Sequence, residues 1–246
     1  MKLTLNGLRD KQAWASANIA LPPYDVAALQ KKTYEEPRWV HFGIGNIFRI
    51  FLGSVADDLI ARGLMDTGIT CAETFDFDIA DKIYAPHDNL CLAVTLHKDG
   101  SMDKRVIGSL AECVKAKSDD AASWARLKEI FRAPSLQMVS FTITEKGYAL
   151  HKTDGSYLGY VAKDIDNGPS APTGAMAVAA AMLLERYKAG GTPITLSSMD
   201  NCSHNGSLLR TSVLTMAQEW KKRGFVDEEF LDWLQDEAKV SFPWSM

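Results

Sequence analysis

The chain alternates between short apolar runs of strand length and longer stretches in which apolar residues recur at helix spacing. The apolar runs occupy residues 39–42, 69–73, 138–144 and 194–198, and the helical patterns occupy residues 121–131, 174–187, 207–223 and 227–239. A strand buried in a parallel sheet reads as a nearly continuous apolar run. Strands that alternate with helices predict an α/β fold, with a mostly parallel sheet and helices on both of its faces.

Two regions interrupt this alternation. Residues 90–96 and 105–110 flank a turn signal at Asp99-Gly100, which predicts a hairpin added to the main sheet. Residues 151–172 are polar and contain several glycines and prolines, so we expect a surface loop there.

The N-terminal residues lack a comparable pattern. A Pro22-Pro23 break divides a short segment from a brief helical pattern, and Pro37 precedes the first strand. We therefore expect an N-terminal arm at residues 1–37 and one domain from 38 to 246.

The segment after the first strand carries the main candidate chemistry. Gly43-Ile44-Gly45 leads into a helical pattern in which Ile47, Phe51, Val55 and Leu59 share one face. A strand, a glycine turn and a helix form the setting in which backbone N–H groups bind a dinucleotide phosphate. The match to G-x-G-x-x-G is partial, because Phe48 replaces the third glycine, although Arg49 follows and could bind a phosphate. On spacing alone, a phosphate site and a plain packing corner both remain open.

Glu73 ends the second apolar run, 28 residues after Gly45. An acid at the end of the second strand binds the ribose hydroxyls in dinucleotide-binding folds, and Asp76 and Asp78 compete for this role. No Arg or Lys lies between Cys71 and Asp81, so nothing there matches the 2′-phosphate of NADP. The segment therefore favours NAD over NADP.

Composition limits the remaining function classes. The net charge is −4 with no basic stripe, which argues against nucleic acid and anionic membranes as partners. No apolar run approaches the ~18 residues of a membrane helix, and the N-terminus does not resemble a signal peptide. The four cysteines are widely spaced, as expected for reduced thiols in the cytoplasm.

Four motifs in register resemble the polyol-specific long-chain dehydrogenases, the group of mannitol 2-dehydrogenase, fructuronate reductase and tagaturonate reductase. The motifs are His-Phe-Gly-Ile-Gly-Asn-Ile-Phe-Arg (41–49), Thr-Ile-Thr-Glu-Lys-Gly-Tyr (142–148), Asp-Asn-Cys-Ser-His-Asn-Gly (200–206) and Phe-Pro-Trp-Ser-Met (242–246). The resemblance implies that residues 38–246 form an NAD-binding Rossmann-type domain. This sequence departs from the family pattern at Phe48, where members often have His, and at Trp244, where typical members have a small residue or Asn.

The resemblance also implies roles for individual residues. Asn201 matches an asparagine that steadies the developing oxyanion, and Glu145 matches a glutamate associated with proton movement. Catalysis in the family is metal-free, and we expect no metal here, because Cys202 and His204 alone do not complete a zinc site. We assign Asn205 to helix capping. The expected cofactor-binding residues are Gly43, Gly45, Asn46, Ile47, Arg49 and Glu73.

Family members continue for roughly another domain beyond the last motif and carry their catalytic lysine there. We therefore expect this chain to be the cofactor-binding part of a longer NAD-dependent oxidoreductase that interconverts a sugar alcohol or sugar acid and its keto form. Lys146 is a second candidate base, although a solvated lysine is the simpler interpretation. The surface left by the missing domain predicts self-association. Two alternatives remain open: a catalytically silent dinucleotide-binding module, and a methyltransferase of similar topology.

Overall fold

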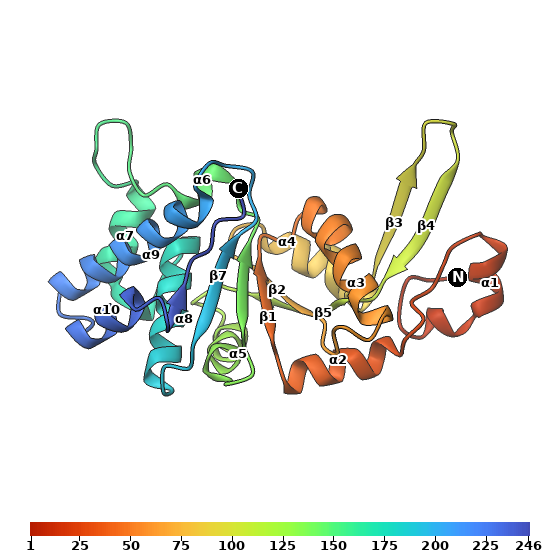
Figure 1. Cartoon of the computed structure of the whole chain (residues 1–246), viewed down its shortest axis with the longest axis horizontal. Helices are drawn as coiled ribbons and strands as arrows, with labels where there is room; N and C mark the ends of the chain where they lie inside the picture. The colour runs from red at the N-terminus through yellow and green to blue at the C-terminus, as the bar shows by residue number, and fades with distance from the viewer. The chain divides into compact units, whose positions relative to one another are not determined.

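The computed structural model describes residues 1–246, and its main sheet has six strands (Figure 1). The strand order is β5-β2-β1-β6-β7-β8, and the β1–β6, β6–β7 and β7–β8 pairs are parallel. The strands are β1 Trp39–Phe42, β2 Ile69–Glu73, β5 Leu110–Lys115, β6 Met138–Phe141, β7 Ile194–Ser198 and β8 Val240–Ser241. Counted along this sheet alone, the order is 3-2-1-4-5-6, that of the Rossmann fold. The predicted fold class is confirmed.

The predicted hairpin forms a separate two-stranded sheet. Strands β3 (Cys91–Leu96) and β4 (Met102–Ile107) pair antiparallel, with Leu96 opposite Met102. The turn between them contains Gly100, which has a φ of +84° that favours glycine.

The α-helices fall between and around the strands. They are α1 Lys11–Ser16, α2 Val26–Glu35, α3 Gly53–Ala61, α4 Phe77–Ile79, α5 Ala121–Arg132, α6 Thr144–Tyr148, α7 Gly159–Asn167, α8 Ala175–Lys188, α9 Asn205–Lys222 and α10 Glu228–Gln235. Single π-helical turns at Phe48–Leu52 and Ala80–Tyr84 precede α3 and follow α4. No helix combines the length and the apolar character needed to cross a bilayer.

The chain divides into two compact units. The first comprises Met1–Arg38, Ile44–Cys71 and Asp76–Cys113, and the second comprises Trp39–Gly43, Ala72–Phe75 and Val114–Met246. The predicted arm, residues 1–37, thus packs with later segments of the first unit. The predicted division into an arm and a domain stays a prediction.

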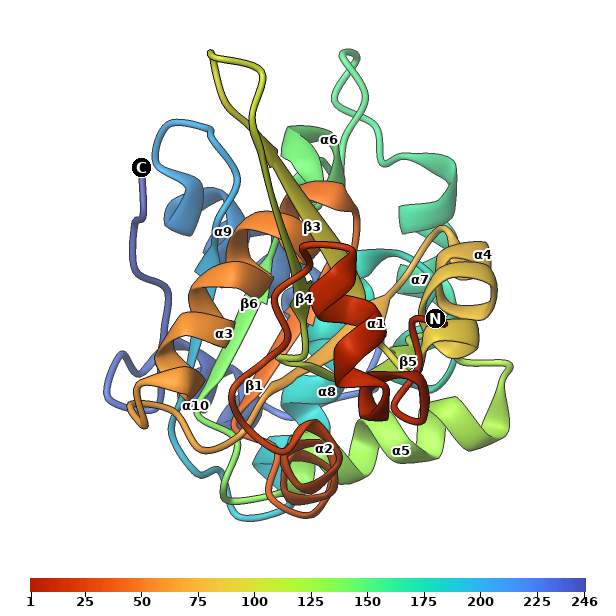
Figure 2. The ribbon, with the colours of Figure 1, turned by 90° about the vertical axis from the view of Figure 1, so that its right-hand side faces the viewer.

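The N-terminal segment of the first unit packs against the hairpin, which Figure 2 presents towards the viewer. Trp14, Val26, Leu90 and Val106 form a buried apolar cluster. The Trp14 indole donates to the Gly7 carbonyl at 2.8 Å, and the Leu5 amide donates to Asp88 at 2.8 Å. These contacts explain why residues without a long apolar pattern are ordered.

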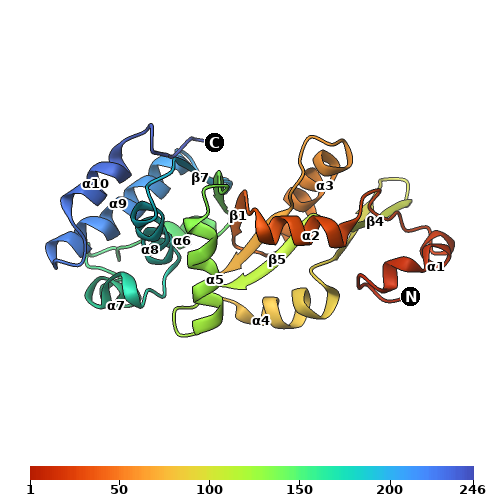
Figure 3. The same cartoon turned by 90° about the horizontal axis from the view of Figure 1, so that it is seen from below.

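The second unit has a large core centred on α8, which Figure 3 shows together with α5, α9 and α10. Residues 176–184 are all buried, because α5 and α9 both pack against α8. Arg186, near the end of α8, is 1% exposed and donates to the carbonyls of Phe131, Ala133, Leu136, Thr192 and Pro193. Its guanidinium holds two loops to the helix end, while burial lowers its pKa to about 10.

Part of the expected surface loop at 151–172 is a helix, so that prediction was wrong. Helix α7 buries Val161 and Ile165, and the Asp164 carboxylate accepts hydrogen bonds from the amides of Thr173 and Gly174 at 2.9 and 2.7 Å. The glycines and prolines around α7 end it and redirect the chain, and they concealed the helix in the sequence.

The helix after the glycine turn has a different buried face from the one its pattern suggests. Ile47, Phe51 and Val55 are 73%, 65% and 44% exposed. The buried residues in this stretch include Phe48 and Ala56. The predicted apolar stripe therefore faces solvent instead of the core of its unit.

Candidate functional site

Gly43 forms the corner at the end of β1. Its φ is +90°, and a Cβ at this position would lie 2.1 Å from the Thr142 carbonyl oxygen, so only glycine fits. The Thr142 hydroxyl donates to the Gly43 carbonyl at 2.8 Å, and the Gly43 amide donates to the Ala72 carbonyl at 3.3 Å. The carboxyl ends of β1, β2 and β6 therefore meet at this corner, where the strand order reverses between β1 and β6. Such reversal points are the ligand-binding edges of open α/β sheets.

His41 supports this corner from inside the sheet. It is fully buried, with Nδ1 2.6 Å from the Ser140 hydroxyl and Nε2 2.9 Å from the Thr142 hydroxyl. Burial lowers the pKa of His41 to about 3, so the imidazole is neutral at physiological pH. His41 is therefore a structural part of the β1–β6 junction.

No group of three or more His, Cys, Asp or Glu side chains is arranged to hold a metal ion.

The helix that follows begins directly at Gly45. The Arg49 amide donates to the Gly45 carbonyl at 3.0 Å, which closes the first helical turn. A Cβ on Gly45 would have no atom within 4 Å, so its backbone is open to an approaching group. Asn46 and Ile47 are exposed on this turn.

The Arg49 side chain lies over the same turn. Its guanidinium donates to Asn46 Oδ1 and sits 6.0 Å from the centre of the Tyr84 ring. Its Nε is buried and makes no hydrogen bond. A buried, charged N–H without an acceptor is costly in a folded protein, and an anion bound at the turn would supply that acceptor. Gly45 and Arg49 therefore fit a phosphate group.

Glu73 lies at the carboxyl end of β2 as predicted and is 6% exposed. Its Oε1 accepts the amides of Thr74 and Phe75, both at 2.9 Å, which fixes the carboxylate at the strand end. The competing Asp78 forms an exposed ion pair with Lys82 at 2.6 Å, and Asp76 occupies the N-cap position of α4. Because Gly43 bonds to Ala72, the neighbour of Glu73, the acid and the glycine corner lie on adjacent strands.

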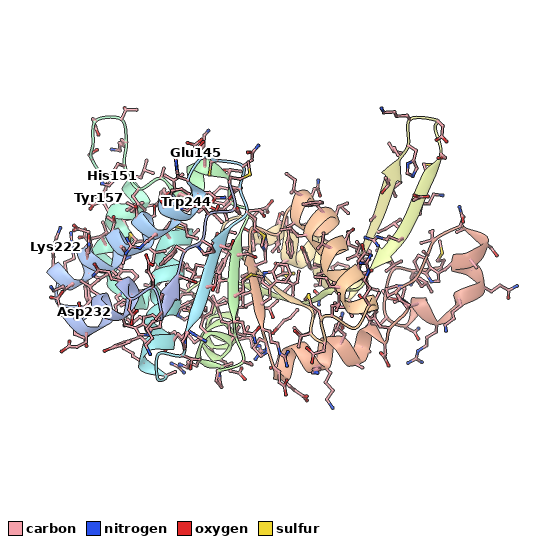
Figure 4. The ribbon with its side chains drawn as sticks, in the orientation of Figure 1. Glu145, His151, Tyr157, Lys222, Asp232 and Trp244 are labelled. Carbon is pink, nitrogen blue, oxygen red and sulfur yellow. The ribbon has the colours of Figure 1, made fainter.

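Glu145 and Asn201 follow β6 and β7, and both are exposed (Figure 4 labels Glu145). Cys202, next to Asn201, has a raised pKa because of burial and the negative charges of Asp200 and Glu145. The hydrogen bonds from the Ile143 and Thr144 amides to Asp200 place the Glu145 and Asn201 segments at the same edge of the second unit. Lys146 is exposed on the short helix α6 beside Glu145.

Asp200 organises this edge, a role that sequence reasoning missed. Its carboxylate accepts the amides of Ile143 and Thr144 at 2.9 and 3.0 Å, and the Tyr148 hydroxyl at 2.7 Å. Strand β6 ends at Phe141, before the predicted run to residue 144, and Thr144, with a φ of +65°, begins the short helix α6. The only signal in the sequence was an acid directly after an apolar run.

Asn205 does not cap helix α9, so that assignment was wrong. His204 occupies the N-cap position with a φ of +54°, and Asn205 turns inward and is fully buried. Its Nδ2 donates to the Ser198 carbonyl, the Asp200 carbonyl and the Ser245 hydroxyl at 3.1, 3.0 and 2.7 Å. Asn205 therefore joins the end of β7 to the last residues of the chain.

Trp244 lies against the same turn. Its ring meets His204 edge-on, with centres 4.5 Å apart, and its indole donates to the Ser207 hydroxyl at 2.9 Å. Figure 4 labels Trp244. A Cβ on Gly206 would lie 2.4 Å from the Pro243 carbonyl oxygen, so the glycine lets the final segment cross the start of α9. The motifs at 200–206 and 242–246 hold each other in place.

The chain is similar in sequence to several oxidoreductases. It is 46% identical over 246 residues to the D-mannonate oxidoreductase of Thermotoga maritima, covering 100% of this chain and 45% of that protein. It is 31% identical over 231 residues to the mannitol 2-dehydrogenase of Cereibacter sphaeroides, covering 92% and 44%. The chain thus spans about half the length of the curated relatives it matches.

The fold is similar to solved enzymes of the same kind. The ternary complex of Pseudomonas fluorescens mannitol 2-dehydrogenase with NAD and D-mannitol has a TM-score of 0.77 at 28% identity, covering 98% of this chain and 46% of that one. A substrate-free D-sorbitol dehydrogenase has a TM-score of 0.75 at 27% identity, covering 92% and 44%. The family described as the mannitol dehydrogenase Rossmann domain matches residues 37–246. The chain therefore belongs to the mannitol dehydrogenase family and contains its Rossmann domain.

Proposed function

We propose that this chain is the NAD-binding part of an oxidoreductase that interconverts a polyol or hexonate and the corresponding ketose or keto-uronate. The observation that carries the proposal is the buried, unpaired Nε of Arg49 beside the open backbone of Gly45. It is the feature expected of a turn that receives a pyrophosphate. The similarity to D-mannonate oxidoreductase favours a sugar acid over a simple polyol. Our proposal extends to a reaction of the fructuronate reductase type.

The cofactor residues divide into two sets by their chemistry. Gly45, Asn46, Ile47 and Arg49 bind the pyrophosphate through backbone N–H groups and the guanidinium, while Gly43 forms the corner that precedes them. Glu73 accepts the ribose hydroxyls. Its negative charge opposes a 2′-phosphate, so NAD is preferred over NADP. When bound, NAD supplies the acceptor for the substrate hydride.

Asn201 and Glu145 serve the reacting end of the substrate. The exposed Asn201 amide donates a hydrogen bond to the substrate oxygen as negative charge develops there, which lowers the barrier. Glu145, on the same edge and exposed, passes protons between the site and solvent. The base that takes the alcohol proton is a lysine in the remaining half of the full-length protein, so the chain alone does not turn over. The proposed reaction requires no metal.

The exposed apolar residues support a partner for this chain. Ile47, Phe51 and Val55 form a solvent-facing stripe on one side of the helix after the glycine turn. We assign this stripe to packing within the full-length enzyme, and we expect the isolated chain to self-associate through it. No disulfide joins the four cysteines, Cys71, Cys91, Cys113 and Cys202, and we propose the reducing cytoplasm as the compartment.

Turnover by the full-length protein tests the proposal. NADH consumption is followed with D-fructuronate, D-tagaturonate and D-fructose as substrates, with the 246-residue chain as a matched control. The expected result is reduction of a keto-uronate by the full-length protein and none by the chain alone. NADH binding without turnover of any ketose or keto-uronate would instead support a silent dinucleotide-binding module.

A further inference from the structure

Tyr84 contacts the backbone of the glycine turn and is not part of any of the four motifs. It ends the π-helical turn Ala80–Tyr84 and is 1% exposed. Its hydroxyl donates to the carbonyl of Ile44 at 3.1 Å, and Ile44 is the residue between the two glycines of the turn. Tyr84 therefore holds the backbone of the turn from a segment 40 positions later in the chain.

The ring of Tyr84 also contacts the arginine of the turn. The Arg49 guanidinium lies 6.0 Å from the ring centre, within the range of a cation–π interaction. The other side-chain contact of this guanidinium is with Asn46 Oδ1. The tyrosine and the asparagine together restrict a long side chain that would otherwise sample many rotamers.

The environment of Tyr84 keeps its phenol a donor. Burial raises the pKa of Tyr84 far above its usual range, and the nearby Cys71 and Cys113 thiols add to the effect. Burial also raises the pKa of the nearby Cys71 thiol. The phenol is therefore neutral wherever the protein is folded, and its proton remains directed at the Ile44 carbonyl.

The unpaired Nε of Arg49 indicates why Tyr84 and Asn46 restrict this side chain. A free arginine would turn its N–H groups to solvent, yet here Nε is buried without an acceptor. We propose that Tyr84 is a positioning residue that holds both Arg49 and the glycine turn in the geometry that receives the pyrophosphate of a dinucleotide. The inference rests on the proposed NAD function and adds to it a residue that touches no cofactor atom.

The test measures binding of NADH, ADP-ribose and adenosine to the 246-residue chain by calorimetry. Tyr84→Phe removes the hydrogen bond to the turn and keeps the ring, while Tyr84→Leu removes both contacts. Tyr160→Phe is the matched control, because the Tyr160 hydroxyl also donates to a backbone carbonyl, that of Ala149 at 3.3 Å, in the second unit. Thermal unfolding of each variant reports its stability separately.

The expected result is selective loss of the ligands that carry a pyrophosphate. Tyr84→Phe lowers the affinity for NADH and ADP-ribose about fivefold, which corresponds to the loss of one neutral hydrogen bond. Tyr84→Leu lowers both affinities roughly 30-fold, because it also removes the ring contact with Arg49. The affinity of the Tyr84 variants for adenosine stays at the wild-type value. The Tyr160→Phe variant binds all three ligands with wild-type affinity.

Two results would overturn the inference while leaving the proposed function intact. One is wild-type NADH affinity in both Tyr84 variants, and the other is an equal loss for adenosine and ADP-ribose, which indicates a purely structural role. Failure of the wild-type chain to bind NADH would remove the proposed function and the role of Tyr84 together.

Discussion

The side chain of Asn205 holds Ser245 through two hydrogen bonds, from Ser245 N to Asn205 Oδ1 at 3.1 Å and from Asn205 Nδ2 to Ser245 Oγ at 2.7 Å. Ser245 Oγ in turn donates to the Ser198 carbonyl at the end of β7 at 2.6 Å. One buried amide thus connects a strand end, the start of α9 and the final segment. The edge that carries Asn201 depends on this connection.

Asn205→Ala is therefore expected to destabilise the protein. The substitution removes the Asn205 donor from the Ser198 and Asp200 carbonyls and releases Ser245, the second side-chain donor to Ser198, at a cost of about 3 kcal/mol. Urea unfolding measures the change. Asn201→Ala, at an exposed neighbouring position, is the control and should change the free energy of unfolding by less than about 0.5 kcal/mol. Equal effects of the two substitutions would contradict the role given to Asn205.

Glu73→Ala tests the ribose assignment. Loss of hydrogen bonds to a charged carboxylate should weaken NADH binding by roughly 10- to 100-fold, because each is worth about 1.5–3 kcal/mol. Calorimetric titration measures the affinity, and circular dichroism verifies the fold. Asp76→Ala is the matched comparison. If Asp76→Ala weakens binding and Glu73→Ala does not, the ribose acid is Asp76.

His41 gives a prediction about pH. Its pKa is about 3 in the folded chain and near 6.5 when unfolded, so below pH 6.5 the unfolded state binds a proton that the folded state does not. The stability that comes from keeping His41 neutral is complete above pH 6.5 and declines as the pH falls towards 3. Between pH 7.5 and pH 5 the loss from this group alone is about 2 kcal/mol. Urea unfolding at both pH values measures it.

His41→Gln supplies the comparison for that measurement. Glutamine cannot take up a proton, so the variant should lose about 2 kcal/mol less than the wild-type protein over the same pH interval. An identical pH dependence in both proteins would show that His41 is not the group responsible.

Asn201→Ala examines the reacting end of the site in the full-length enzyme. Loss of a donor to a developing oxyanion lowers kcat by about 100- to 1,000-fold, while NADH affinity remains close to the wild-type value. Steady-state kinetics and calorimetry separate these two quantities. Asn201→Asp keeps the shape but replaces the donor with a negative charge, and it should be at least as inactive. Full turnover by Asn201→Ala would exclude the oxyanion role.

The features that the sequence predicted correctly are those set by neighbouring residues in the chain, such as the bounds of individual strands. The strands at 69–73 and 194–198 have the bounds that their apolar runs indicated, because a continuous apolar run has few alternatives in an α/β chain. Gly63, with a φ of +70°, follows the C-cap of α3, a position at which glycine commonly ends a helix. Helix α10 ends at Gln235, before the predicted 239, because the chain turns at Asp236 to form β8.

The misses depend on contacts that no single segment encodes. Asp200 binds backbone amides 56 and 57 positions earlier, and Asn205 binds Ser245 40 positions later. Asparagine and aspartate are both common in helix caps and turns, so the residue types at 200 and 205 suggested a local role. The exposed stripe of Ile47, Phe51 and Val55 has the spacing of a core-facing helix, and spacing alone does not tell which surface will cover it.

Family membership removes the methyltransferase alternative, and the sequence motifs already favoured that outcome. The motifs did not reveal that Tyr84 supports the glycine turn, because its contact with Ile44 spans 40 residues. Spacing within a motif reports the residues that touch a ligand, whereas the groups that position them are found only in the folded chain.

Calorimetric titration of the 246-residue chain with NADH, followed by NADPH, tests the central claim most directly. The account predicts saturable binding of NADH and much weaker binding of NADPH, because in the proposed site Glu73 would accept the ribose hydroxyls and repel a 2′-phosphate. Absence of NADH binding by a chain that circular dichroism shows to be folded would contradict the account. The glycine turn and Arg49 would then be a packing corner and not a cofactor site.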